Sequence, residues 1–89
     1  MDIIKSATAG TMESSDAYVE IEPSNGKNEV DVESIVWMQF GDKIRNAAED
    51  VLNEMEVKNA KIRIVDRGAL ECVIRARVET AVMRGKGEE

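Results

Sequence analysis

Residues 17–33 read AYVEIEPSNGKNEVDVE, and this stretch decides how the chain folds. Apolar and polar residues alternate in both of its halves, which is the period of a strand with one buried face. Asn25-Gly26 lies between the halves, and this dipeptide is typical of a tight hairpin turn. We therefore predict a β-hairpin of residues 17–22 and 30–33.

A long amphipathic helix is expected after this hairpin. Ser34 is a candidate for its N-cap, because a serine hydroxyl accepts well from the first free amides of a helix. The apolar residues that follow recur at the spacing of one helical face. They are Phe40, Ile44, Ala47, Ala48, Val51, Leu52 and Met55.

A strand, a turn and a second helix are expected in the last third of the chain. Residues 60–66 alternate as a strand does, and Asp66 is a candidate cap for the helix after the turn that it begins. An apolar stripe of Leu70, Val73, Ile74, Ala81 and Val82 then predicts a helix that ends near Gly85. The order of elements predicts an α+β two-layer sandwich, a small antiparallel sheet packed on two helices. We expect a single domain over residues 1–84 and a flexible tail over 85–89.

The composition excludes several classes of function. The 89 residues include no histidine and one cysteine, Cys72, so a histidine base, a cysteine zinc site and an intrachain disulfide are excluded. Residues 1–57 hold 13 acids and 4 bases, a balance that disfavours nucleic acid and favours a basic protein partner. No apolar run predicts a signal peptide or a membrane span, so we expect a cytoplasmic protein.

One hydroxyl-rich segment, TMESSD at residues 11–16, is the candidate site. It can be an ordinary turn in which Ser14 or Asp16 bonds its own backbone. It can also present an exposed serine that another enzyme modifies, because such a site needs exposure and local mobility. No residues elsewhere form a Ser-His or Cys-His pair or a phosphate-binding glycine loop, so we do not expect an enzyme that acts alone.

Three blocks of sequence resemble one known family. AGTMESSD at residues 9–16, QFGD with the following Ile44-Arg45, and DRGALECVIRAR at residues 66–77 lie in the same order and register over about residues 3–84. The chain thereby resembles the acyl carrier (gamma) subunits of citrate lyase. It departs from them at Ser15, where we expect glycine, and this creates a second candidate hydroxyl.

The resemblance implies a carrier with a covalent prosthetic group. Ser14, with Ser15 as second choice, would hold phosphoribosyl-dephospho-CoA through a phosphodiester, and the thiol of that group would carry acetyl and citryl thioesters. The surrounding Gly10, Thr11, Glu13 and Asp16 would form the turn and its docking surface. The implied partners are the alpha (CoA-transferase) and beta (citryl lyase) subunits and a prosthetic-group transferase, with no nucleic acid, membrane or metal.

Several alternatives remain open at this stage. The chain can instead be the carrier of malonate decarboxylase or citramalate lyase, or a non-carrier acidic assembly subunit. Cys72 can be an acyl thiol, but inert packing on an apolar helix is the expected role. Arg75 and Arg77 can neutralise phosphates of the arm, although Arg75 is expected to form surface pairs with Glu71 and Glu79.

Overall fold

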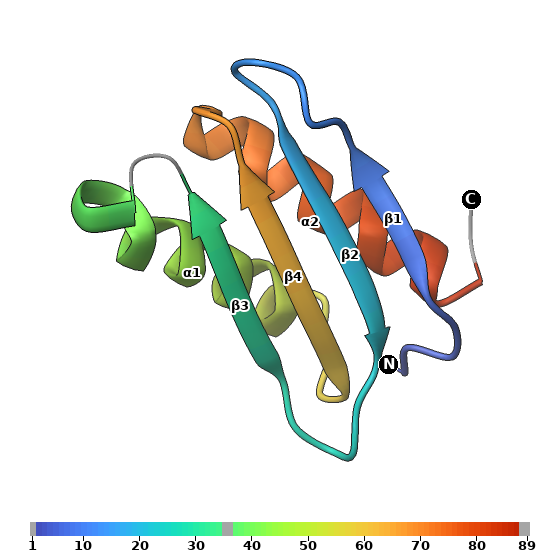
Figure 1. The fold of residues 1–89 in the computed structure, drawn as a ribbon. Helices are drawn as coiled ribbons and strands as arrows, with labels where there is room; N and C mark the ends of the chain where they lie inside the picture. The colour runs from blue at the N-terminus through green and yellow to red at the C-terminus, as the bar shows by residue number, and fades with distance from the viewer. Residues whose placement is uncertain (1, 35–36, 88–89) are drawn as a thin grey trace.

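A four-stranded sheet with two helices on one of its faces forms the molecule (Figure 1). The computed structural model describes residues 2–34 and 37–87. The elements in chain order are β1 (Ala7–Gly10), β2 (Ala17–Pro23), β3 (Glu29–Ser34), α1 (Trp37–Glu54), β4 (Ala60–Asp66) and α2 (Glu71–Gly85). This arrangement confirms the predicted α+β class, two-layer architecture and two helices.

The predicted hairpin between residues 17–22 and 30–33 is wrong. The strand order is β1-β2-β4-β3, so β4 separates the two strands, antiparallel to β2 and parallel to β3. Ser24 donates its amide to the Asn59 carbonyl at 2.8 Å, and the Asn28 side chain donates to the Val57 carbonyl at 2.8 Å and accepts from the Ala60 amide at 3.0 Å. The loop therefore bonds to the segment entering β4 and leaves room for that strand.

The hairpin of this sheet is formed by β1 and β2. Their antiparallel register pairs Ala7 with Ile21 and Gly10 with Tyr18. The connection between them is residues 11–16, which is the candidate site. A hairpin loop of this length projects beyond the end of the sheet, and Figure 1 shows it doing so.

The core lies between the sheet and the helices, where both predicted stripes supply buried side chains. The alternate residues of β2 and β4 meet Ile44, Ala47, Ala48, Val51 and Leu52 from α1 and Ile74, Val78, Ala81 and Val82 from α2. Two predicted core residues are wrong, since Phe40 is 43% exposed and Leu70 is 72% exposed. Both lie at the N-terminal ends of the helices and border a pocket described below.

The opposite face of the sheet is charged. Arg63 lies 2.7 Å from Glu20 and 3.6 Å from Glu33, and Lys61 lies 3.8 Å from Glu22. These ion pairs join neighbouring strands across the face that the helices leave open. Within residues 2–34 and 37–87, neither helix is long and apolar enough to cross a membrane.

The N-terminal segment is tied to the end of α2. Ile4 and Lys5 donate their amides to the Gly85 carbonyl at 2.9 and 3.2 Å. Gly85, at which we expect the tail to begin, is thus the last residue of α2 and is buried. Residues 88 and 89 lie outside the described part, and the looseness of the tail stays a prediction.

Candidate functional site

The turn of residues 11–16 lies at the end of the sheet where both helices begin (Figure 1). Ser14 is exposed there, as are Thr11, Glu13 and Ser15, whereas Asp16 is half-buried. The predicted site residues are therefore brought together on one projecting loop, because they are also neighbours in sequence.

Hydrogen bonds inside the turn brace it around Ser14. The Thr11 hydroxyl donates to Oδ2 of Asp16 at 2.7 Å and accepts from the Glu13 amide at 3.1 Å. The Asp16 amide donates to the Glu13 carbonyl at 3.2 Å. Among the residues that the structure describes, no hydrogen bond engages the Ser14 hydroxyl. The turn is thus braced by Thr11 and Asp16, and it leaves the Ser14 side chain exposed, together with those of Glu13 and Ser15.

Arg77 of α2 anchors the turn through the Asp16 carboxylate. Its Nε and Nη2 donate to Oδ1 and Oδ2 of Asp16, both at 3.0 Å, which is a bidentate pair. The bonds from Arg77, from the Thr11 hydroxyl and from the Ala17 amide hold the pKa of the Asp16 carboxyl well below its usual range. Asp16 is therefore a fixed anion that Arg77 neutralises.

The two arginines weighed in the sequence have structural partners. Arg77 is engaged by Asp16, a pairing that no sequence spacing indicated because 61 positions separate them. Arg75 does pair on the surface, but not with Glu71 and Glu79. Its Nη2 lies 2.9 Å from both carboxylate oxygens of Glu54, and its Nη1 lies 3.8 Å from Asp50. Arg75 thus joins α2 to α1.

Gly10 is required where β1 ends and the turn begins. Its φ is +87°, and a Cβ added there would lie 1.9 Å from the Ala17 carbonyl oxygen and 3.1 Å from Cδ of Arg77. No side chain fits at this distance from a backbone atom. Gly10 therefore allows β1, the start of β2 and Arg77 to close around the base of the turn.

Ser15 occupies a backbone conformation that favours glycine. Its φ is +66°, and its amide donates to the Arg67 carbonyl at 2.8 Å, while the Arg67 amide donates to the Asp16 carbonyl at 2.9 Å. A residue with a Cβ costs about 1–2 kcal/mol in this left-handed region. This cost explains why glycine is the expected residue at position 15.

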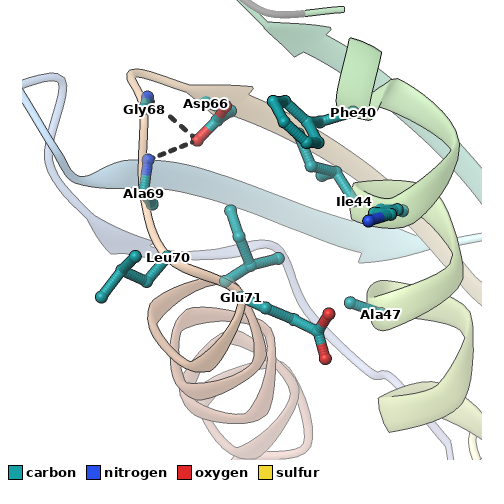
Figure 2. Close-up of a pocket in the computed structure, with 10 residues that line it drawn as sticks. Phe40, Ile44, Ala47, Asp66, Gly68, Ala69, Leu70 and Glu71 are labelled. Atoms are coloured by element: carbon teal, nitrogen blue, oxygen red, sulfur yellow. Dashed lines mark hydrogen bonds between the residues drawn. The ribbon is translucent and has the colours of Figure 1, made fainter.

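The turn between β4 and α2 adjoins the serine turn through Arg67. Asp66, which is 1% exposed, accepts from the amides of Gly68 at 3.2 Å and Ala69 at 2.9 Å (Figure 2). It also accepts from the Ser34 hydroxyl at 2.8 Å. The prediction that Asp66 caps the helix is wrong, because α2 begins at Glu71 with Leu70 as its N-cap. Asp66 instead fixes the preceding turn and joins it to the end of β3.

A largely apolar pocket of about 400 Å³ opens between the start of α1 and this turn (Figure 2). Its lining residues are Phe40, Lys43, Ile44, Ala47, Asp66, Gly68, Ala69, Leu70, Glu71 and Ile74. Lys43 Nζ lies 5.7 Å from the centroid of the Phe40 ring, within the range of a cation–π contact. The sequence indicated the apolar members Phe40, Ile44, Ala47, Leu70 and Ile74 only as core, and nothing in their spacing distinguishes a pocket.

Cys72 is exposed on α2, so its predicted role in apolar packing is wrong. It is the second residue of the helix, two positions before the first buried residue, Ile74. No cluster of three histidine, cysteine, aspartate or glutamate residues that suits a metal ion occurs in the part of the chain that the structure describes.

Comparisons with known proteins agree on one family. The family described as malonate decarboxylase delta subunit matches residues 4–85. The citrate lyase acyl carrier protein of Cronobacter sakazakii is 50% identical over 84 residues, which cover 94% of this chain and 87% of that protein. The citrate lyase acyl carrier protein of Vibrio cholerae is 52% identical over 85 residues, which cover 94% of this chain and 87% of that protein.

The fold is also found in a solved structure. A chain in the crystal structure of a Pseudomonas malonate decarboxylase hetero-tetramer in complex with malonate superposes with a TM-score of 0.78 and 21% identity. The superposition covers 96% of this chain and 88% of that one, which shows a shared fold. Citrate lyase acyl carrier proteins match this chain at 50% and 52% identity over nearly its whole length. This protein therefore belongs to the acyl carrier protein family of citrate lyase and malonate decarboxylase, and within it to the citrate lyase carriers.

Proposed function

We propose that this chain is the acyl carrier subunit of a citrate lyase and that Ser14 carries its prosthetic group, phosphoribosyl-dephospho-CoA, through a phosphodiester. The observation that carries the assignment is the Ser14 hydroxyl, which is exposed and has no hydrogen bond to the described residues, on a turn that Thr11 and Asp16 brace. Such a hydroxyl can reach the active site of a modifying enzyme while the hydrogen bonds of the turn stay intact. Exposure and a projecting loop are what a modification site requires.

Ser14 is favoured over Ser15 by the backbone. Ser15 has φ +66° and its amide bonds to the Arg67 carbonyl, so a shift of the backbone at Ser15 would disturb that contact. Ser14 has no such constraint among the described residues. A transferase that needs to reshape the local backbone meets less resistance at Ser14.

The loading step needs chemistry that this chain does not itself provide. The Ser14 oxygen attacks the phosphorus of an activated phosphoric anhydride of the group, forms the new O–P bond and displaces the terminal phosphates as leaving group. The hydroxyl proton passes to a base of the transferase. Glu13 is not assigned that role, because no contact brings its carboxylate to the hydroxyl.

The charge around Ser14 suits a polyanionic donor better than the sequence indicates. Asp16 is neutralised by Arg77, so it repels a phosphate weakly, and Glu13 remains as the exposed acid of the turn. Thr11 and Asp16 are engaged in hydrogen bonds within the turn, and Gly10 lies at its base. Docking of partners on this turn would therefore use Glu13 and the half-exposed Met12.

A tethered thioester explains how so small a chain serves a lyase. The arm presents its acyl group to successive active sites at high effective concentration without dissociation. The alpha subunit would exchange acetyl for citryl, and the beta subunit would stabilise the enolate left when citryl is cleaved. The carrier itself would supply no catalytic residue and would work in the cytoplasm within the lyase complex.

Intact-mass spectrometry of protein purified from its native source tests the proposal. We expect an increment equal to the prosthetic group on the peptide that contains Ser14, and its loss in Ser14→Ala. Ser15→Gly is the matched control, because it alters the adjacent hydroxyl while suiting the backbone, and it should keep the increment. Native protein of bare polypeptide mass in a lyase with full activity would refute the carrier role. A mass increment that is retained in Ser14→Ala would refute Ser14 as the attachment site.

The family description and the shared fold favour malonate decarboxylase as the second candidate. Reconstitution distinguishes the two activities. The loaded carrier should support cleavage of citrate with citrate lyase alpha and beta subunits. Support of malonate decarboxylation alone would favour the second candidate.

A further inference from the structure

We propose that the nucleotide end of the prosthetic group docks on the carrier itself, with its adenine in the pocket between α1 and the β4–α2 turn and its phosphate against Arg67. This inference rests on the proposed function. It divides the arm into a held base and a free pantetheine end, so that the swinging part would begin beyond the adenosine.

The pocket lies within reach of Ser14. The Ser15 amide and the Arg67 carbonyl oxygen are 2.8 Å apart. With standard backbone dimensions, this contact places the Cα atoms of Ser14 and Gly68 within about 8 Å. Gly68 lines the pocket, and about a dozen bonds of roughly 1.5 Å separate a serine Cα from the adenine of such a group.

The lining suits a flat aromatic base. Phe40 and Leu70, which both line the pocket, are 43% and 72% exposed, and neighbouring exposed apolar side chains often mark a surface that binds a ligand or partner. An aromatic ring stacks on any base, and Glu71 at the rim supplies an acceptor of the kind that the adenine amino group needs. The volume of about 400 Å³ lies in the range of small-molecule sites.

Arg67, which directly precedes the lining residue Gly68 in the chain, is a cation that is available for phosphate. Arg63, Arg75 and Arg77 each pair with a carboxylate. Within residues 2–34 and 37–87, by contrast, no carboxylate pairs with the exposed Arg67, whose backbone bonds directly to the serine turn.

Lys43 adds a second cation at the rim, over the Phe40 ring. Lys43 in the lining and Arg67 next to Gly68 in the chain complement a phosphorylated base better than an apolar helix of a partner. The attachment at Ser14 also supplies the nucleotide at high effective concentration, so a modest intrinsic affinity suffices.

The test compares amide resonances of the full chain before and after loading, in ¹⁵N–¹H correlation spectra, with the loaded state verified by intact mass. Loading should shift the amides of Lys43, Gly68, Ala69 and Leu70 as well as those of the turn. Contacts between adenine protons and the Phe40 ring should appear in nuclear Overhauser spectra. Loaded protein whose shifts stay within residues 10–17 overturns the inference.

Variants locate the two contacts. Phe40→Ala and Arg67→Gln change exposed side chains, and each should keep the mass increment while losing most of the pocket shifts. Met83→Ala is the control, since Met83 is 39% exposed near the other end of α2, and it should keep them. Pocket shifts that arise only when alpha and beta subunits are added would assign the pocket to a partner and overturn the inference. A missing mass increment in native protein refutes the proposed function instead.

Discussion

Replacing Gly10 by alanine tests whether the close approach at the base of the serine turn holds the site together. The added Cβ would lie 1.9 Å from the Ala17 carbonyl oxygen at a φ of +87°. The left-handed backbone costs about 1–2 kcal/mol. Forcing atoms into a filled space costs about 1–3 kcal/mol more. The reduced entropy of the unfolded chain returns about 0.4–1 kcal/mol.

The expected net loss for Gly10→Ala is therefore about 1–5 kcal/mol in the free energy of unfolding. Gly26→Ala is the matched control, because Gly26 has φ +85° and a Cβ added there would meet no atom within 4 Å. It carries the backbone cost without the collision, so it should lose about 0–2 kcal/mol. Urea unfolding measures both, and thermal unfolding should separate them, since each kcal/mol corresponds to about 4–8 °C in a domain of this size.

The two variants should also differ in loading. Gly10→Ala displaces the start of β2 and Arg77, so the transferase should load Ser14 more slowly, whereas Gly26→Ala lies beyond the opposite end of β2 and should load normally. Equal losses of stability in the two variants would refute the reasoning, because the collision would then contribute nothing. Normal loading of a destabilised Gly10→Ala would show that the turn need not be braced.

Four further outcomes are expected. Because the pKa of Asp16 is lowered in the fold, its pair with Arg77 stabilises the protein above the pKa of an unfolded aspartate, about 3.9, and this contribution is lost as the pH falls below that value. Arg77→Met should thus cost more in urea unfolding at about pH 6 than at about pH 3, and equal costs would contradict the pairing. Leu52→Ala removes a fully buried side chain and should lower the free energy of unfolding by about 2–5 kcal/mol; a loss within error of zero would contradict its place in the core. Ser15→Gly should leave stability unchanged or raise it by up to about 1 kcal/mol, and a clear loss in urea unfolding would contradict the left-handed backbone. Iodoacetamide should alkylate Cys72 in the folded, unloaded chain without altering its unfolding curve, and a requirement for denaturant would contradict its exposure.

The periodicity of the sequence predicts the elements well and their neighbours poorly. Helical spacing locates α1 and α2, because one buried face is enough to produce the pattern. Strand alternation reports burial of one face but not which strand lies beside which. Asn25-Gly26 therefore suggested a hairpin, while the side chain of Asn28 bonds to the chain entering β4.

The candidate site also has a part that the sequence predicts and a part that only the folded chain shows. Ser14 and its turn are contiguous, so composition and resemblance both lead to them. The anchor Arg77 and the neighbouring Arg67 come from distant positions, and only the folded chain shows them beside the turn. The exposure of Phe40 and Leu70 is equally invisible in the sequence, because an apolar residue at helical spacing reads as core whether or not another element covers it.

The central place of β4 governs how the chain acquires its shape during synthesis. Residues 60–66 pair with both β2 and β3. Until they are synthesised, the first 59 residues contain no strand that can join β2 to β3. A ribosome-bound chain of that length carries two unsatisfied strand edges, which invite pairing with other chains. Productive assembly of the sheet thus awaits the last third of the polypeptide, and truncation before β4 should yield aggregates rather than a smaller domain.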